Sequence, residues 1–166
     1  MITLSTQKQI LNQHGFANMV LDTSTNQKSL HAVNTIEAAT IITHFSTKAV
    51  YNAPSYLTIQ TGNNRHITLL PEFLQYVNHS CQPNVFFDTT LMQLIALKRI
   101  EINEEFRFFY PSSEWQMTQA FVCNCGESNC LQVIQGAAYL GSHIIKQYQF
   151  TDYIKEQLVK KQLANI

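Results

Sequence analysis

The four cysteines limit most strongly how this chain of 166 residues can fold. Three of them lie together in the run Cys123-Asn-Cys125-Gly-Glu-Ser-Asn-Cys130. Thiolates at this spacing can surround one ion with a small loop, and Gly126 lets that loop turn tightly. Zinc binds four thiolates in tetrahedral geometry at about 2.3 Å, so an ion held by this run would need one more ligand.

The fourth cysteine, Cys81, lies well upstream in the middle of the chain. If it completes the site, the metal joins the C-terminal segment to the centre of the protein and orders a segment that has little core of its own. Two alternatives stay open from the residues alone. The four thiols can be reduced and unlinked, or the run can belong to a separate zinc ribbon, although a ribbon needs two local pairs of ligands.

The composition narrows the class of protein. Charged residues make up 13% and the net formal charge is zero, without the basic run that is typical of nucleic-acid binders. Hydrophobic residues make up 45%, which at this length suffices for one domain with a real core. Residues 1–20 lack the apolar segment of a secretory signal, and no stretch is long enough to span a membrane. We expect a cytoplasmic monomer, with the nucleus or a host cell as other reducing locations, and no nucleic-acid or membrane partner.

Short strands separated by turns are the main pattern along the chain. Beyond short strands before residue 25, β-rich runs cover residues 39–45, 56–60, 85–87, 94–97 and 106–110. Pro71 favours a short helix over residues 71–76, and the apolar positions Leu158, Val159, Leu163 and Ile166 predict a helix at the C-terminus. The pattern predicts a mainly β fold with few helices.

The run Tyr76-Val-Asn78-His79-Ser-Cys81-Gln-Pro-Asn84 is dense in side chains that both donate and accept hydrogen bonds. A turn rich in asparagine chemistry would explain one such residue. The whole run is better explained as a loop that crosses the protein and binds a polar ligand.

This run resembles the Asn-His-Ser-Cys-x-Pro-Asn signature of SET-domain methyltransferases. A second signature of that family, Glu-Glu-Leu-x-Phe-Asp-Tyr, is similar to the run Glu104-Glu-Phe-Arg-Phe-Phe-Tyr110. The family's post-SET pattern, Cys-x-Cys-x4-Cys, is similar to the run from Cys123 to Cys130. The three signatures occur in the family's order, and the resemblance covers residues 27–136.

The resemblance implies a fold of small curved β-sheets with a knot-like threading of the C-terminal segment. It implies a SET domain over residues 1–120, a post-SET zinc-binding segment over 121–136 and a C-terminal helical extension over 137–166. In the family the cysteine of the first signature is the fourth zinc ligand. By resemblance the ligands of one zinc ion are therefore Cys81, Cys123, Cys125 and Cys130.

The activity implied is methyl transfer from S-adenosylmethionine to a lysine amine of a protein, with histones as one candidate substrate. Tyr110 corresponds to the family's catalytic tyrosine, which also contacts the cofactor. Asn78 and His79 correspond to the pair that holds S-adenosylmethionine. Leu131 corresponds to a residue that lies against the adenine.

A lysine amine must be neutral to attack, yet its pKa is about 10.4, so such a site has to remove a proton. An aromatic channel would exclude water and tolerate the cationic product. By resemblance Phe87 takes the product-specificity position, where phenylalanine favours di- or trimethylation. Trp115 is a candidate for the wall of the channel or of the cofactor pocket. The alternative for both residues is plain packing in the core.

The family's cofactor loop, Gly-x-Gly-Leu-Phe-Ala, aligns with residues 27–32, where Ser29 and Leu30 are the candidate cofactor-binding residues. Gln27 and Ser29 stand at the two glycine positions. Phe109 replaces the usual aspartate before the catalytic tyrosine, and Gln132 replaces a common post-SET glycine. The lost glycines favour a second hypothesis, a SET-fold binding module without catalysis, and a third is a methyltransferase that acts on a small amine.

Overall fold

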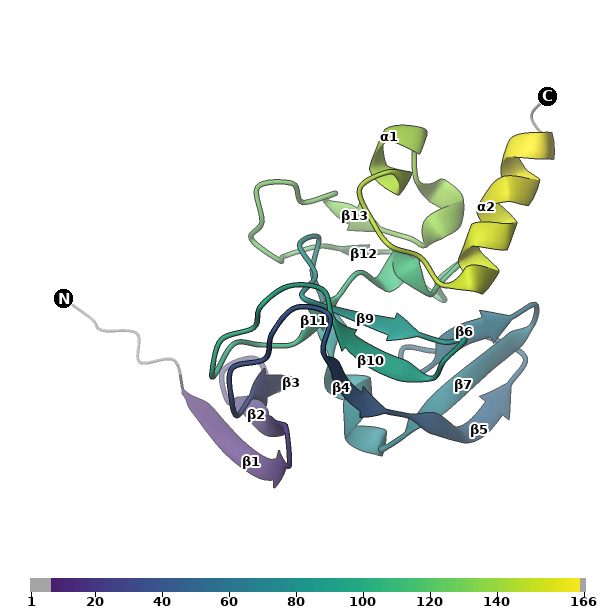
Figure 1. Ribbon diagram of the computed structural model, residues 1–166. Helices are drawn as coiled ribbons and strands as arrows, with labels where there is room; N and C mark the ends of the chain where they lie inside the picture. Colours follow the sequence, from purple (N-terminus) through teal and green to yellow (C-terminus); the bar gives the residue numbers. More distant parts are fainter. Residues whose placement is uncertain (1–6, 165–166) are drawn as a thin grey trace.

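The computed structural model describes residues 7–164 and shows several small β-sheets of two or three strands rather than one large sheet (Figure 1). Strands β1 (Lys8–His14), β2 (Ala17–Asp22) and β3 (Gln27–Ala32) form an antiparallel sheet in that order. Gly15 and Asn26 have left-handed backbone angles, with φ of 52° and 58°, at the two turns between them. Glycine and asparagine tolerate this conformation best, so these two residues suit the turns.

Two further antiparallel sheets of three strands carry the main core. The first has the order β4 (Ile41–His44), β10 (Gln93–Ala96) and β9 (Val85–Asp88). The second has the order β5 (Ser46–Tyr51), β7 (Arg65–Leu70) and β6 (Ile59–Gly62). Buried side chains from both sheets, among them Ile67, Phe87 and Leu94, belong to one apolar cluster. Burial of this shared surface holds the two sheets together.

A short parallel pair brings distant segments of the chain together. The 3-10 helix η1 (Glu72–Tyr76) leads into β8 (Asn78–His79), which pairs in parallel with β11 (Arg107–Phe108). Parallel neighbours need a long crossover, and here the crossover contains β9 and β10. The first signature segment therefore lies directly beside the second.

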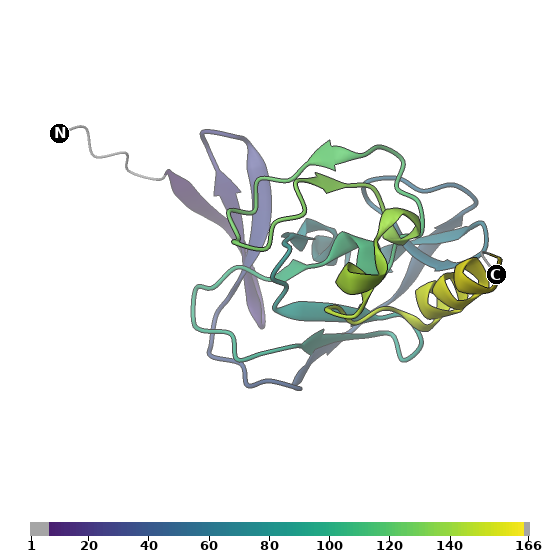
Figure 2. The same ribbon diagram turned by 90° about the horizontal axis from the view of Figure 1, so that it is seen from above.

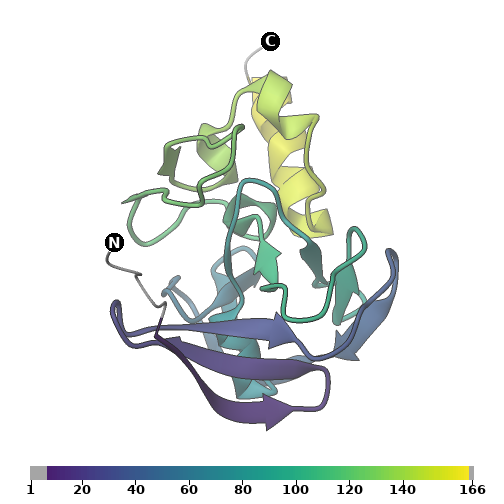
Figure 3. The ribbon, with the colours of Figure 1, turned by 90° about the vertical axis from the view of Figure 1, so that its left-hand side faces the viewer.

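The C-terminal part is built on a second apolar cluster. Its elements are η2 (Tyr110–Ser112), β12 (Phe121–Val122), β13 (Val133–Ile134), η3 (Ala137–Tyr139), α1 (Ser142–Ile145) and α2 (Asp152–Ala164). Ile154 and Leu158 of α2 pack with Phe109, Ala137 and Phe150 in this cluster. Figures 2 and 3 show α2 and the β1–β3 sheet at opposite ends of the molecule.

The mainly β fold predicted from the sequence is confirmed, and β9 and β10 match their predicted ranges within one residue. Strand β6 begins at Ile59 rather than at Tyr56, because residues 55–58 form a turn in which the backbone N–H of Thr58 donates to the Ser55 carbonyl at 3.2 Å. Strand β11 is shorter than predicted, since Tyr110 already belongs to η2.

The C-terminal helix is longer than predicted. It begins at Asp152, ahead of the predicted start at Leu158, and the predicted position Ile166 lies outside the described residues. Within residues 7–164, no helix has both the length and the apolar character that crossing a membrane requires.

Candidate functional site

One cavity of about 890 Å³ brings together three of the predicted site residues, Asn78, Phe87 and Tyr110. Its wall includes Asn78 from β8, Phe87 from β9, Phe108 from β11 and Tyr110 from η2. The Phe87 and Phe108 rings meet edge to face with their centroids 4.9 Å apart, and the Phe108 and Tyr110 rings follow at 4.8 Å. Three aromatic rings in a row give the cavity an apolar wall beside a phenol.

Tyr110 is held in place through its backbone. Its N–H donates to Nδ1 of His79 at 3.2 Å, and the two rings lie edge to face at 5.1 Å. Burial, together with the negative charge of Glu105, raises the pKa of the Tyr110 phenol to about 12. The hydroxyl therefore keeps its proton at neutral pH, so Tyr110 can orient a reacting group by hydrogen bonding but is not a base.

Asn78 and His79 do different work, although they are neighbours. The Asn78 amide donates to the Lys28 carbonyl at 3.0 Å and to Glu105 Oε1 at 3.1 Å, and so ties β3 to the second signature. His79 supports Tyr110 and is not part of the cavity wall. Burial lowers the pKa of His79 to about 4, so its ring is neutral and Nδ1 can accept the Tyr110 hydrogen bond.

Ser29 and Leu30 do not line the cavity. Leu30 is fully buried in the main core, and its carbonyl accepts from the backbone N–H of Phe106 at 2.8 Å. The Ser29 hydroxyl lies 2.9 Å from Nε2 of His31. The preceding residues, Asn26, Gln27 and Lys28, line the cavity in their place.

The backbone at the two lost glycine positions is ordinary. Gln27 and Ser29 lie in the extended strand β3, and the left-handed residue is Asn26, one position before it. No glycine is therefore needed here for conformation, and what the substitutions change is the space that the Gln27 side chain fills.

The other two candidates lie behind the cavity. Trp115 packs with the C-terminal apolar cluster, and its backbone N–H donates to Gln60 Oε1 at 2.9 Å. Leu131 lies between that cluster and the cysteines, with its N–H 3.4 Å from the Cys81 sulfur. Neither is part of the cavity wall.

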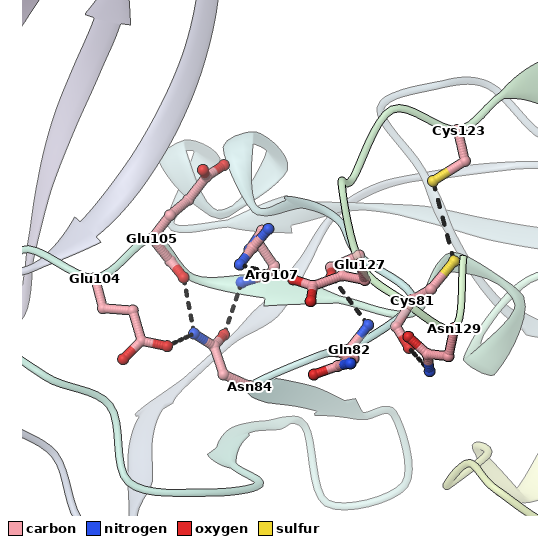
Figure 4. Close-up of polar contacts among 10 residues, drawn as sticks. Cys81, Gln82, Asn84, Glu104, Glu105, Arg107, Cys123, Glu127 and Asn129 are labelled. Atoms are coloured by element: carbon pink, nitrogen blue, oxygen red, sulfur yellow. Dashed lines mark hydrogen bonds and ion pairs between the residues drawn. The ribbon is translucent and has the colours of Figure 1, made fainter. Parts of the chain in front are cut away.

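The four cysteines converge, as the resemblance implies. All four sulfurs lie within 4.8 Å of one another, and those of Cys81 and Cys123 are 4.0 Å apart (Figure 4). Tetrahedral zinc with bonds of about 2.3 Å would separate its sulfurs by about 3.8 Å, so the cluster fits such an ion. Although burial opposes it, hydrogen bonds from backbone N–H groups lower the pKa of Cys125 to about 7, which favours the thiolate that a metal requires. Burial instead raises the pKa of Cys81, and it raises the pKa of Cys123 to about 11.

Polar contacts brace the cysteine run against the first signature. Tyr148 donates its hydroxyl proton to the Cys81 carbonyl at 2.7 Å. The Asn129 amide donates to the same oxygen at 2.9 Å (Figure 4). Arg107 of β11 lies 3.4 Å from Glu127 in the cysteine run. The four cysteines and the cavity thus share one framework.

Sequence reasoning missed Glu114, which also lines the cavity. Burial raises the pKa of this carboxyl to about 8. Its oxygen Oε1 accepts from the backbone N–H of Gln60 at 3.0 Å. Nothing in the local run Ser112-Ser113-Glu114-Trp115 distinguishes this glutamate from an exposed one.

Comparison with known proteins gives matches over most of the chain. The SET domain family matches residues 13–111, more than half of the chain. The chain is 31% identical over 138 residues to the methyltransferase flvH of Aspergillus flavus, covering 82% of this chain and 77% of that protein. It is 34% identical over 68 residues to the histone-lysine N-methyltransferase, H3 lysine-36 specific, of Candida albicans, covering 37% of this chain and 8% of that protein.

Proposed function

This chain belongs to the SET-domain family of methyltransferases, and we propose that it methylates a lysine side chain of a protein with S-adenosylmethionine as the donor. The observation that carries the proposal is the meeting of Asn78, Phe87 and Tyr110 in one cavity. They come from three elements, and Asn78 and Tyr110 come from the first and second signatures, so chance placement on a shared surface is a poor explanation.

The residues of the cavity suit this chemistry. When bound, S-adenosylmethionine supplies a methyl group on a positively charged sulfur. Tyr110, protonated at neutral pH, orients the amine and the methyl through its hydroxyl oxygen. The faces of Phe87 and Phe108 exclude water and tolerate a methylated ammonium. Because phenylalanine at position 87 brings no hydroxyl, the channel has room for di- and trimethylated amines.

The cofactor would be held where the first signature meets β3. The side chain of Asn78 and the segment Asn26–Lys28 line the cavity together. Lys28, whose ammonium lies 5.1 Å from the centre of the Tyr76 ring, offers a positive charge for the cofactor's carboxylate. We further propose that one zinc ion binds the four cysteines and orders the segment that closes this side of the molecule.

Two observations bear on the substrate. The Candida albicans relative is named for a histone lysine, which supports a protein substrate and makes histones the first candidates. The Aspergillus flavus relative matches most of this chain and is named only as a methyltransferase. That match keeps a small amine as the second candidate substrate.

Calorimetric titration of zinc-loaded protein with S-adenosylmethionine is the first test. Dissociation in the micromolar range, about −8 kcal/mol, is expected, and Asn78→Ala should weaken it. Methyl transfer to core histones and to a lysine peptide array then follows, with Tyr110→Phe as the impaired variant. Binding without transfer to any protein or peptide would leave the small amine, and no binding in folded protein would leave a binding module.

A further inference from the structure

Glu114 is the single carboxylate in the cavity wall within the described part of the chain. Only 7% of the residue is exposed, and it shares the wall with the rings of Phe87, Phe108 and Tyr110. Carboxylates are rarely buried this deeply without a cation. The burial of Glu114 beside an aromatic cavity is therefore unusual and suggests a function.

The position of Glu114 is fixed from two sides. In front, its Oε1 accepts from the N–H of Gln60, whose own side-chain oxygen accepts from the N–H of Trp115. Behind, the N–H of Ala137 donates to the Glu114 carbonyl at 2.8 Å. The carboxyl group is thus held by backbone on rigid elements, which is how a reacting group is kept in register.

No cation neutralises Glu114 among residues 7–164. The ion pairs among these described residues involve other acidic side chains: Glu37, Glu72, Glu101, Glu127 and Asp152. The titratable groups around it are Lys28, Tyr56, Tyr76 and Tyr110 in the cavity wall, with His66 and Tyr153 beside Gln60. None of these forms a hydrogen bond or an ion pair with the carboxyl group. Within residues 7–164, Glu114 therefore has no cationic partner, and a cation that enters the cavity could bind it.

We infer that Glu114 receives the substrate ammonium in the cavity and accepts its proton, an inference that rests on the lysine methyltransferase function proposed above. In this step one N–H bond of the ammonium breaks, its electron pair stays on nitrogen, and an O–H bond forms on the Glu114 carboxylate. The nitrogen pair is then free to take the methyl group. The proton passes to water before the next cycle.

The surroundings favour this transfer. Burial penalises a carboxylate and an ammonium alike, whereas a neutral carboxylic acid beside a neutral amine carries little desolvation cost. The raised pKa of Glu114 shows the same preference in the absence of substrate. The Tyr110 phenol, with a pKa of about 12, stays protonated and cannot take the proton, whereas Glu114, with a pKa of about 8, can lose its own proton and accept one from the ammonium.

The first experiment needs no turnover and no known substrate. Protein labelled with ¹³C at glutamate carboxyl carbons is titrated with n-butylamine, which has the head group of lysine. The Glu114 signal, assigned with Glu114→Gln, should titrate near pH 8 alone and at higher pH with n-butylamine bound, because the transferred proton stays on the carboxyl group. Binding of n-butylamine should be lost in Glu114→Gln and kept in Glu156→Gln, an exposed glutamate on α2. A Glu114 signal that ignores n-butylamine would overturn the inference.

The second experiment reads the proton transfer itself, in kcat/KM for the best peptide from the array. The wild-type value should level off above about pH 8. Glu114→Gln should be roughly 100-fold slower at pH 7 and keep rising toward the lysine pKa of about 10.4. A peptide with S-(2-aminoethyl)cysteine in place of lysine, whose amine is less basic, should restore part of the lost rate.

The outcomes separate the two proposals. Parallel pH profiles of the wild type and Glu114→Gln, with both folded and active, would overturn the role of Glu114 and leave the methyltransferase function standing. An inactive wild type that binds n-butylamine through Glu114 would overturn the lysine methyltransferase function. Equal affinity of both proteins for S-adenosylmethionine is expected, because Glu114 acts on the amine and not on the donor.

Discussion

Asn84 links more of the fold than a turn residue usually does. It is 2% exposed, and its amide donates to Glu104 Oε1 at 3.0 Å and to the Glu105 carbonyl at 2.8 Å (Figure 4). Its side-chain oxygen accepts from the backbone N–H of Arg107 at 2.8 Å. Asn84 therefore holds the two signature segments in register along the β8–β11 pair.

Removing these bonds should destabilise the protein. Asn84→Ala leaves buried partners unsatisfied, so we expect the free energy of unfolding in urea to fall by about 2–4 kcal/mol. Asn63→Ala, an exposed turn position, is the matched control and should change it by less than about 0.5 kcal/mol. Equal effects of the two substitutions would show that the Asn84 contacts contribute little.

The candidate site residues differ in how well their positions could be predicted from the sequence. The resemblance predicted that Cys81 joins the distant cysteines, and the structure places its sulfur beside theirs. The roles of Asn78, Phe87 and Tyr110 stay predictions, although the structure brings these residues to one cavity. Glu114 could not be found, since its burial comes from contacts with Gln60, which no local pattern records.

At the scale of elements, Gly136 controls how the cysteine segment joins the helical extension. Its φ is 120°, and a Cβ at this position would lie 2.5 Å from the Trp115 carbonyl oxygen. Gly126 in the cysteine run also has a positive φ, of 75°, but a Cβ there meets nothing within 4 Å. The two glycines share backbone strain and differ in available space.

Gly136→Ala should therefore cost much more than Gly126→Ala. The first forces backbone apart and should lower the free energy of unfolding by several kcal/mol, on the order of 3–5. The second adds only left-handed strain, about 1–2 kcal/mol. Urea unfolding of both variants, followed by circular dichroism, measures the difference, and similar midpoints would contradict the close contact at Trp115.

The elements that sequence predicted best are those that local patterns determine. Strands β9 and β10 are paired, mostly buried runs of apolar residues, and both were placed within one residue. Strand β6 and helix α2 were misplaced at their starts, because a side-chain turn at Ser55 and the packing of Ile154 decide those boundaries. The knot-like threading stays a prediction from the family.

In the whole molecule, metal removal should increase hydrogen exchange around the cysteine cluster and leave the β5–β7–β6 sheet unchanged. A chelator should release one zinc ion per chain and raise hydrogen exchange at Cys123, whose N–H donates to the Gln132 carbonyl at 2.8 Å, and at Leu131. The β5–β7–β6 sheet has its own buried core and should keep its protection. Unchanged exchange around the cysteines after chelation would argue against a metal site.

The free energy of unfolding of the whole molecule should also depend on pH through the ionisation of Glu114. Folding raises the pKa of Glu114 from about 4.5 to about 8, so the folded state favours the protonated carboxyl. Its contribution is complete below pH 4.5 and is lost as pH rises through about 8. Glu114→Gln cannot ionise, so its stability relative to the wild type should increase by roughly 3–5 kcal/mol between pH 5 and 9. Denaturant titrations of both proteins across this range test the sign, and a constant difference would contradict it.

The order in which the chain is synthesised determines when the contacts of the first signature can form. A ribosome adds the strands β1 to β10 first, and these already contain the three larger sheets. The first signature then forms its contacts with residues 104–110, and after them those with residues 123–130, as these segments are synthesised. A nascent chain released between these points would carry Asn78, Phe87 and Tyr110 but lack the cysteines from Cys123 to Cys130. The cysteine cluster can therefore form only after translation has passed Cys130.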